Sequence, residues 1–325
     1  MKTRSLVMIL GGIILIIFGF SNFAAAMDYP TRPIQIIDPF GAGSSTTMNA
    51  RIIAQSFSQI LERAVVVVNK PGAGGAVGTA FVAKAKPDGY TLLVFNSASN
   101  GISVTLRPDI GYTNSDFQLI GQYAADDCAM VVKADAPWKT VQDVIEYTRK
   151  NPGVLKYIAS AGGSNRFAME LFLREAGGLK MERIPSEGGG ELAQLLLGGH
   201  GHISFSPAAG QYPLVQAGKA RFLAFANEER NTDFPDVPTL KELGLPGVII
   251  QTWYGLATPK GVPEPIMEKL RETLATTMKD KTVRVMLKNM NNTPVYRTAE
   301  EFSRFVKHME ELYIRVAKEA DIKLK

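Results

Sequence analysis

The residue types best suited to chemistry gather at positions 38–52, where the sequence reads DPFGAGSSTTMNARI. This stretch follows an apolar run and precedes an amphipathic one, so it joins a predicted strand to a predicted helix. The first backbone N–H groups of such a helix have no partners, and its dipole favours negative charge there. Two glycines would let a ligand approach the backbone, and three hydroxyl side chains add donors: Gly41, Gly43, Ser45, Thr46 and Thr47. The pattern favours a site for a carboxylate or phosphate, although a plain helix cap or a nucleophilic serine would use the same residue types.

A second loop of the same kind, AGGSNR, follows the apolar segment LKYIAS at 155–160. It adds the guanidinium group of Arg166, which can bind a carboxylate through two parallel hydrogen bonds. Taken singly, each loop is also typical of a structural cap, and an arginine is often only a solvated charge. Two such loops in successive strand–helix units favour a shared ligand site.

Other chemistries are poorly supported by the sequence. The segment PGAGGAVG at 71–78 is not a dinucleotide-binding fingerprint, because Val77 stands where the last glycine belongs, and no P-loop motif occurs. A hydrolase that used Ser45 or Ser164 would need a base at a recognisable spacing, and there is no G-x-S-x-G elbow. Metal-ligand spacing is also missing around the three histidines, His200, His202 and His308. We therefore predict no catalytic residue, no metal site and no cofactor.

Hydrophobic periodicity predicts strands that alternate with helices, which is typical of the α/β class with parallel sheets. Strands are expected at 33–37, 64–68, 91–95, 129–133, 155–160, 202–206 and 221–226. Helices are expected at 46–62, in a stretch ending near 84, from 140 to about 151, and at 167–176 and 191–197. The C-terminal part is expected to be mostly helical, with a capping box at Thr298 and Glu301. Because ligands bind at the carboxyl ends of strands in such sheets, two facing edges would form the cleft of a bilobed binding protein.

The N-terminus has the features of a secretory signal peptide. Lys2 and Arg4 precede the apolar run LVMILGGIILIIFGF, and three alanines at 24–26 supply a cleavage site. The apolar run is shorter than the roughly 20 residues that a membrane-spanning helix needs. We expect residues 1–26 to be removed near Ala26 and the mature chain to be periplasmic.

The composition also narrows the class of protein. With 325 residues, 46% hydrophobic and 21% charged, the chain has the length for two globular domains. Its net charge of +5 includes no Lys/Arg block, so nucleic-acid binding is not expected. The single cysteine, Cys128, is predicted to be a buried small side chain, because Asp126 and Asp127 would raise the pKa of its thiol.

Four segments, in order, resemble the periplasmic substrate-binding proteins of tripartite tricarboxylate transporters, the Bug family. They are YPTRPIQIIDPFGAGSST, VVVNKPGAGGAVGTAFVAKAKPDGYTLL, TDFPDVPTLKELGLPG and WYGLATPKGVPEPI. The resemblance covers essentially the whole mature chain. It implies a two-lobed fold like that of type II periplasmic binding proteins, each lobe a mixed or parallel sheet flanked by helices. Residues 27–125 with 227–325 would form one domain and residues 126–226 the other, with hinge crossings near 124–127 and 226–229.

In that family two loops hold the ligand's carboxylate through backbone amides and hydroxyl groups, and three further loops complete the wall. The residues that this resemblance assigns to the site are Phe40, Gly41, Ala42, Gly43, Ser45, Thr46, Thr47, Ser97, Ser160, Ala161, Gly162, Ser164, Asn165, Arg166, Ser186, Gly188 and Ser206. The sequence departs from the family pattern at four of them. Thr47 and Ser206 stand where an aspartate is usual, Arg166 replaces a histidine, and Ser186 replaces a tyrosine.

These departures remove acidic groups and add a cation, so we expect a dicarboxylate, a tricarboxylate or an aromatic acid as ligand. The resemblance implies a monomeric, non-catalytic receptor that delivers this carboxylate to membrane transporter subunits in transient contacts. An exported sensor that binds the same ligand and signals through a membrane partner is the alternative.

Overall fold

The computed structural model describes residues 28–319, apart from residues 43, 108, 160–163, 187–188, 228 and 291. The expected signal peptide lies outside this range, as do five predicted site residues: Gly43, Ser160, Ala161, Gly162 and Gly188. No helix in the described part of the chain combines the length and the apolar character that crossing a membrane requires.

The first half of the fold is a mixed sheet of six strands. Parallel strands β1 (Ile34–Asp38), β2 (Val65–Asn69) and β3 (Thr91–Asn96) stand in the order β2-β1-β3. Strand β9 (Gln251–Pro259) pairs antiparallel with β3 and β4, and β10 (Thr293–Thr298) pairs antiparallel with β4. The helices of this half are α2 (Ser45–Leu61), α3 (Ala76–Ala83), α9 (Glu264–Lys279) and α10 (Lys281–Asn289).

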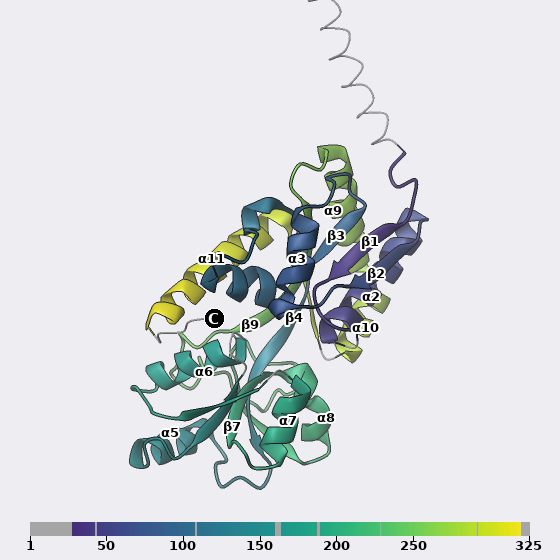
Figure 1. The fold of residues 1–325 in the computed structure, drawn as a ribbon. Coiled ribbons are helices and arrows are strands. Elements are labelled where there is room, and N and C mark those ends of the chain that lie inside the picture. Colours follow the sequence, from purple (N-terminus) through teal and green to yellow (C-terminus); the bar gives the residue numbers. More distant parts are fainter. Residues whose placement is uncertain are drawn as a thin grey trace, which may run out of the picture.

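The second half is built around the other end of strand β4 (Phe117–Lys133), which runs through both halves (Figure 1). Strands β7 (Ile203–Pro207) and β8 (Ala220–Phe225) pair antiparallel with it. Strand β5 (Lys156–Ala159) pairs parallel with β7 and with β6 (Glu182–Pro185). Four helices accompany these strands: α5 (Val141–Lys150), α6 (Ser164–Glu175), α7 (Gly189–Leu197) and α8 (Ala208–Gln216).

Three chain segments meet at one level between the two halves. Strand β4 pairs with β9 as far as Asp127 and with β7 from Cys128 onward. The amide of Ala226 donates to the carbonyl of Cys128 at 2.7 Å, and that of Ile250 donates to Ala226 at 3.0 Å. The last helix, α11 (Ala299–Glu319), bridges the halves, because Tyr313 packs edge-on against Phe167 of α6 at 5.4 Å.

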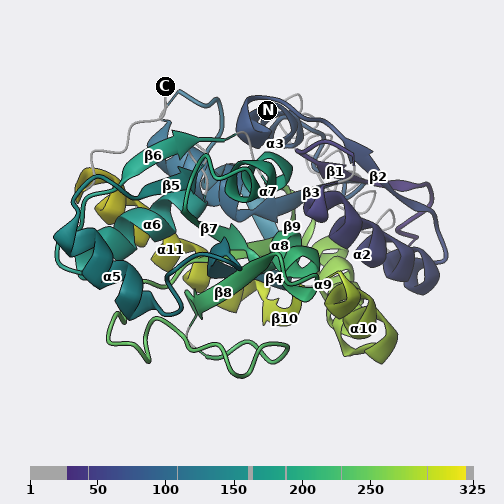
Figure 2. The same ribbon diagram turned by 90° about the horizontal axis from the view of Figure 1, so that it is seen from below.

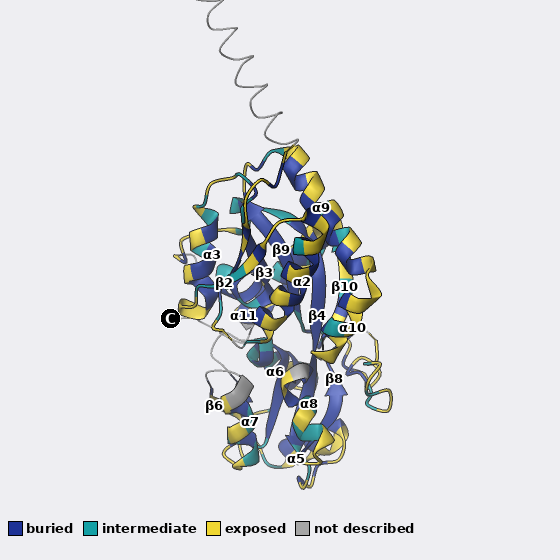
Figure 3. Cartoon of the chain, turned by 90° about the vertical axis from the view of Figure 1, so that its right-hand side faces the viewer, coloured by how far each residue is buried: buried dark blue, intermediate teal, exposed yellow. Residues whose placement is uncertain are grey.

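The apolar residues that the sequence placed in strands and helices form the core. Figure 3 shows the central strands β3, β4 and β9 mostly dark blue and buried, with helices whose outer faces are exposed. Cys128 is 0% exposed, and burial together with Asp126 and Asp127 raises the pKa of its thiol, which confirms the expected buried side chain. The capping boxes at Thr140 and Thr298 are also present.

The structure corrects several boundaries. The expected strand at 129–133 is only the end of β4, and strands β6, β9 and β10 were not predicted. Helix α6 begins at Ser164 rather than at Phe167, so Arg166 lies in its first turn instead of in a loop. The loop after β3 forms the π-helical turn η2 (Ser97–Ser103), followed by the short helix α4 (Val104–Leu106). Two short 3₁₀ turns, η1 (Ala73–Gly75) and η3 (Asn114–Asp116), complete the elements.

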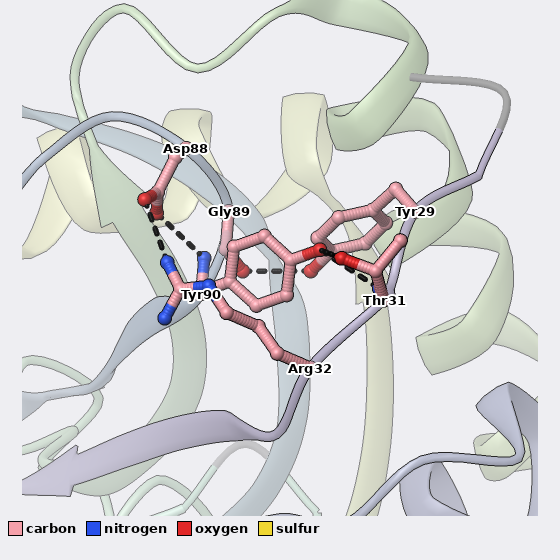
Figure 4. Close-up of polar contacts among 6 residues, drawn as sticks. All are labelled: Tyr29, Thr31, Arg32, Asp88, Gly89 and Tyr90. Atoms are coloured by element: carbon pink, nitrogen blue, oxygen red, sulfur yellow. Dashed lines mark hydrogen bonds and ion pairs between the residues drawn. The ribbon is translucent and has the colours of Figure 1, made fainter. Parts of the chain in front are cut away.

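The start of the described chain is held against the first half by contacts with the turn KPDGY at 86–90 (Figure 4). The hydroxyl of Tyr29 donates to the carbonyl of Gly89 at 2.6 Å, and the amide of Thr31 donates to the hydroxyl of Tyr90 at 2.9 Å. The guanidinium of Arg32 lies 3.9 Å from the centre of the Tyr90 ring and 2.9 Å from a carboxylate oxygen of Asp88. The turn before β3 thus holds the segment that leads into β1.

We expect Tyr29→Phe to lower the free energy of unfolding by about 1–2 kcal/mol. Tyr29 is 2% exposed, and removal of its hydroxyl leaves the Gly89 carbonyl without its hydrogen-bond donor. Denaturant unfolding followed by circular dichroism measures this change. Arg32→Ala is the matched control, with a loss of at most about 1 kcal/mol, since its ion pair is solvent-exposed. Equal losses in the two variants would contradict the buried hydrogen bond as the main anchor.

Candidate functional site

The first predicted loop rests on a buried carboxylate that the sequence analysis did not select. Asp38, at the end of β1, is 0% exposed and accepts from the Phe40 amide at 3.1 Å, the Asn69 side chain at 3.0 Å and the Thr47 hydroxyl. Asn69 also donates to the Phe40 carbonyl at 2.9 Å. Burial raises the pKa of Asp38, and the three hydrogen bonds oppose that rise. Polar residues at the ends of the neighbouring strands β1 and β2 were the signal that could have revealed this pair.

Thr47 belongs to this support and does not face solvent. Its side chain is 0% exposed, and its hydroxyl lies 3.0 Å from that of Ser44 and 3.1 Å from the Gly41 carbonyl. Ser44 caps α2 by accepting from the Thr47 amide at 3.2 Å. Thr47 therefore holds the loop in shape through its buried hydroxyl and does not present that hydroxyl to a ligand in this conformation.

The remaining described residues of this loop divide by exposure. Gly41, Ala42 and Ser45 are exposed, Phe40 is half-buried and Thr46 is 7% exposed. Ser45 lies near the buried Tyr254 of β9, and this polar neighbour opposes the rise that burial causes in the pKa of the Tyr254 phenol. The exposed N-terminus of α2 thus lies beside β9.

The turn after β3 lies at the same sheet edge, because β1 and β3 are parallel neighbours. Asn96 caps η2 by accepting from the amides of Ala98 at 3.0 Å and Ser99 at 3.1 Å. Ser97 is 2% exposed and Asn100 is 0% exposed. A π-helical turn at such an edge is common at functional sites.

The second predicted loop leads into α6 at the edge of the other sheet. The hydroxyl of Ser164 lies 3.4 Å from that of Thr252 on β9, and Asn165 is 6% exposed. The side chain of Arg166 is 16% exposed, and its Nε lies 4.0 Å from a carboxylate oxygen of Glu170. Arg166 therefore already lies beside an acid of its own helix.

The other predicted wall residues of this half are buried. Ser186, after β6, is 8% exposed, and Ser206, on β7, is 1% exposed. Their strands are linked in parallel through β5, so both lie toward the edge at which α6 begins.

The two helix N-termini meet on one face of β9. Ser45 lies near Tyr254, and the hydroxyl of Ser164 lies 3.4 Å from that of Thr252. Thr252 and Tyr254 are two residues apart on β9, so their side chains point to the same side of the strand, about 7 Å from each other. Thr252 and Tyr254 were missed as site residues because they lie nearly 90 positions after Ser164; the only local signal was the motif WYGLATP.

The electrostatics of this region favour an anion. The first turns of α2, η2, α6 and α8 carry no acidic residue, whereas α7 has Glu191. The helix dipoles favour negative charge at these N-termini, and the two carboxylates near Tyr254, those of Asp38 and Asp126, are buried. Metal binding has no comparable support, since no group of three or more His, Cys, Asp or Glu side chains gathers within the described residues.

The histidines do not add chemistry to this region. His202 accepts a hydrogen bond from the Lys156 amide at 2.9 Å, and burial together with Lys156 lowers the pKa of its imidazole. His200 and His308 are exposed.

Comparison with known proteins identifies close structural and sequence relatives. The profile of the tripartite tricarboxylate transporter family receptor matches residues 49–321. Protein BugT of Bordetella pertussis is 31% identical over 328 residues, covering 99% of each chain. An R. palustris protein solved with adipate has a TM-score of 0.82 and 28% identity, covering 91% of this chain and 99% of that one. MatC from Rhodopseudomonas palustris with bound malate has a TM-score of 0.77 and 26% identity, covering 89% and 99% respectively.

Proposed function

This chain belongs to the family of tripartite tricarboxylate transporter receptors, and from that membership we propose that it is a non-catalytic periplasmic receptor for one small organic carboxylate. It would bind the carboxylate between its two halves and deliver it to membrane transporter subunits. The predicted signal peptide supports export, and the two relatives solved with adipate and malate support an acidic ligand.

The observation that carries the proposal is the pair of helix N-termini on one face of β9. Neither α2 nor α6 has an acid in its first turn, and their first residues, Ser45 and Ser164, lie beside Tyr254 and Thr252, which are two residues apart on β9. A ligand with two carboxylates could place one at each N-terminus, where N–H groups and the helix dipoles favour negative charge. We therefore favour a dicarboxylate over a monocarboxylate.

We propose that the binding residues are those of the two loops and of the three wall turns. The exposed Gly41, Ala42 and Ser45 would contact the ligand directly, while Thr47 would act by holding the loop in shape. Arg166 would contribute positive charge, shared with Glu170. Residues 27–125 with 227–325 would close against residues 126–226 by bending where β4, β9 and the segment at 226 cross.

A thermal-shift screen of the mature protein tests this function. We expect malate, adipate or citrate to raise the melting temperature with the logarithm of ligand concentration, with about 2.7 kcal/mol of stabilisation at a hundredfold excess over Kd. Adipamide, in which both acids of adipate become neutral amides, is the matched control and should give no shift. If adipamide and adipate shifted the transition equally, or if only uncharged compounds did so, the anion site would be refuted. NMR of the recovered ligand should show no turnover.

A further inference from the structure

A second cavity lies at the hinge level, on the side of strands β4 and β9 away from the proposed carboxylate site. It has a volume of about 610 Å³, within the range of roughly 300–1,000 Å³ that small-molecule sites occupy. Its walls come from β4, β9, β10, α11 and the segment between β8 and β9, which runs as a green loop along the lower side of Figure 2.

The alternation of side chains along the paired strands separates the two sites. Asp126 pairs with Thr252 and Asp127 pairs with Gln251 in the register of β4 and β9. Thr252 contacts Ser164 on the carboxylate side, so the next residues, Gln251 and Asp127, point to the opposite face and line the cavity. An occupant of this cavity would not compete for the helix N-termini of α2 and α6.

The lining combines an apolar wall with basic groups. One stripe of α11 supplies Phe305, Met309 and Leu312, and Ile249 faces them from the preceding segment. Basic side chains come from the same stripe and from β10: His308, Arg315 and Arg297. The guanidinium of Arg297 lies 4.4 Å from the centre of the Phe305 ring, at the junction of the apolar and charged parts.

The acids of the lining, Asp127 and Glu229, come from β4 and from the segment after β8, and not from the elements that carry these basic groups. Asp127 already accepts from the side-chain amides of Asn231 at 2.8 Å and Gln251 at 3.3 Å. Arg230, also in the lining, is bound to Glu242 at 2.9 Å, which leaves Glu229 as the other acid of the cavity. The lining therefore carries charges of both signs, and an anionic group of an occupant would lie on the side of α11 and β10, beside Arg297 and Arg315.

The buried side-chain oxygen of Asn227 also indicates a ligand. Asn227 is 8% exposed and lines the cavity, and its Oδ1 has no hydrogen-bond partner among the described residues. Buried acceptors are nearly always paired, so an occupant that donates an N–H or O–H group would complete this one. We propose that the cavity is a second small-molecule site, for an amphipathic organic anion that carries such a donor.

The test uses 8-anilinonaphthalene-1-sulfonate, which has an apolar body, one anionic group and one N–H, in isothermal titration calorimetry with the mature protein. We expect one saturable site. Thr293→Phe fills the cavity from an exposed position on β10, and Arg315→Glu reverses an exposed charge on α11; each should weaken binding at least tenfold. Lys318→Glu, the matched reversal on the same helix, and Ala42→Trp, in the carboxylate loop, should change the affinity less than twofold.

Two results would overturn the proposal. One is an unchanged affinity in Arg315→Glu. Arg315 is exposed, so this variant is expected to fold, and its result is sufficient even if Thr293→Phe does not fold. The other is loss of binding in Ala42→Trp, which would place the probe in the carboxylate cleft. Circular dichroism of every variant confirms that each compared protein is folded.

Discussion

Replacing Asp38 by alanine is expected to lower the free energy of unfolding by about 3 kcal/mol or more and to weaken carboxylate binding more than tenfold. Asp38 is 0% exposed, and three donors point at it: the Phe40 amide, the Thr47 hydroxyl and the Asn69 side chain. Each buried donor left unpaired costs about 1–3 kcal/mol. The same donors shape the loop before α2, so its backbone would no longer present N–H groups in one fixed arrangement. Urea unfolding and ligand calorimetry measure the two effects.

Asp135→Ala is the matched control for this substitution. Its carboxylate is 74% exposed and pairs with Lys133 at 3.2 Å on the surface, so we expect a loss below about 1 kcal/mol and unchanged binding. A similar, small loss in Asp38→Ala would mean that the loop is held by other contacts.

The pH dependence of the Asp38 variant follows from its pKa. Burial raises the pKa of Asp38 in the folded protein, so the folded state binds this proton more tightly than the unfolded chain does. The contribution of Asp38 to the free energy of unfolding therefore increases as pH falls through its pKa in the folded protein toward its pKa in the unfolded chain. This contribution is lost as pH rises. The difference in unfolding free energy between wild type and Asp38→Ala should accordingly grow from neutral toward mildly acidic pH.

Local patterns were enough to predict those elements whose partners are close in sequence. β1, α2, β2 and β3 follow one another within 34–96, and apolar spacing located each within about two residues. Strand β4 escaped prediction over 117–128 because its buried stretch carries Gln122, Asp126 and Asp127, which do not alternate with apolar residues. Its partner β9 begins at Gln251, so only the tertiary fold makes these polar residues a strand.

The candidate site shows the same division. The glycine- and serine-rich loops correctly indicated where helices begin. That Ser45 and Ser164 lie beside the same strand, β9, is seen only in the structure. The side of the helix that packs inward was not readable from the sequence; in the structure the hydroxyl of Thr47 donates to the buried Asp38, whereas Ser45 is exposed. The hinge-side cavity had no sequence signature at all, because its walls run from Asp127 to Arg315.

Gly78→Ala is the second substitution with a large expected effect, and it concerns the segment PGAGGAVG. A Cβ at Gly78 would come within 2.7 Å of the Lys70 carbonyl oxygen and 2.8 Å of the Pro39 Cα, both backbone atoms. Real contacts of this kind do not occur at such distances, so α3 or the loop beside Asp38 must move. Overpacking of this type costs about 1–3 kcal/mol. We expect the melting temperature to fall by several degrees, and carboxylate affinity to fall with it.

Binding and stability should be lost together in Gly78→Ala, because Pro39 directly precedes Phe40 and Gly41 in the proposed binding loop. Gly210→Ala in α8 is the matched control: a Cβ there meets nothing within 4 Å, and alanine favours a helix over glycine by about 1 kcal/mol. That variant should be as stable as the wild type or slightly more stable, with unchanged affinity. If Gly78→Ala kept the wild-type affinity despite a lower melting temperature, α3 would have yielded instead of the loop, and the glycine would serve helix packing alone.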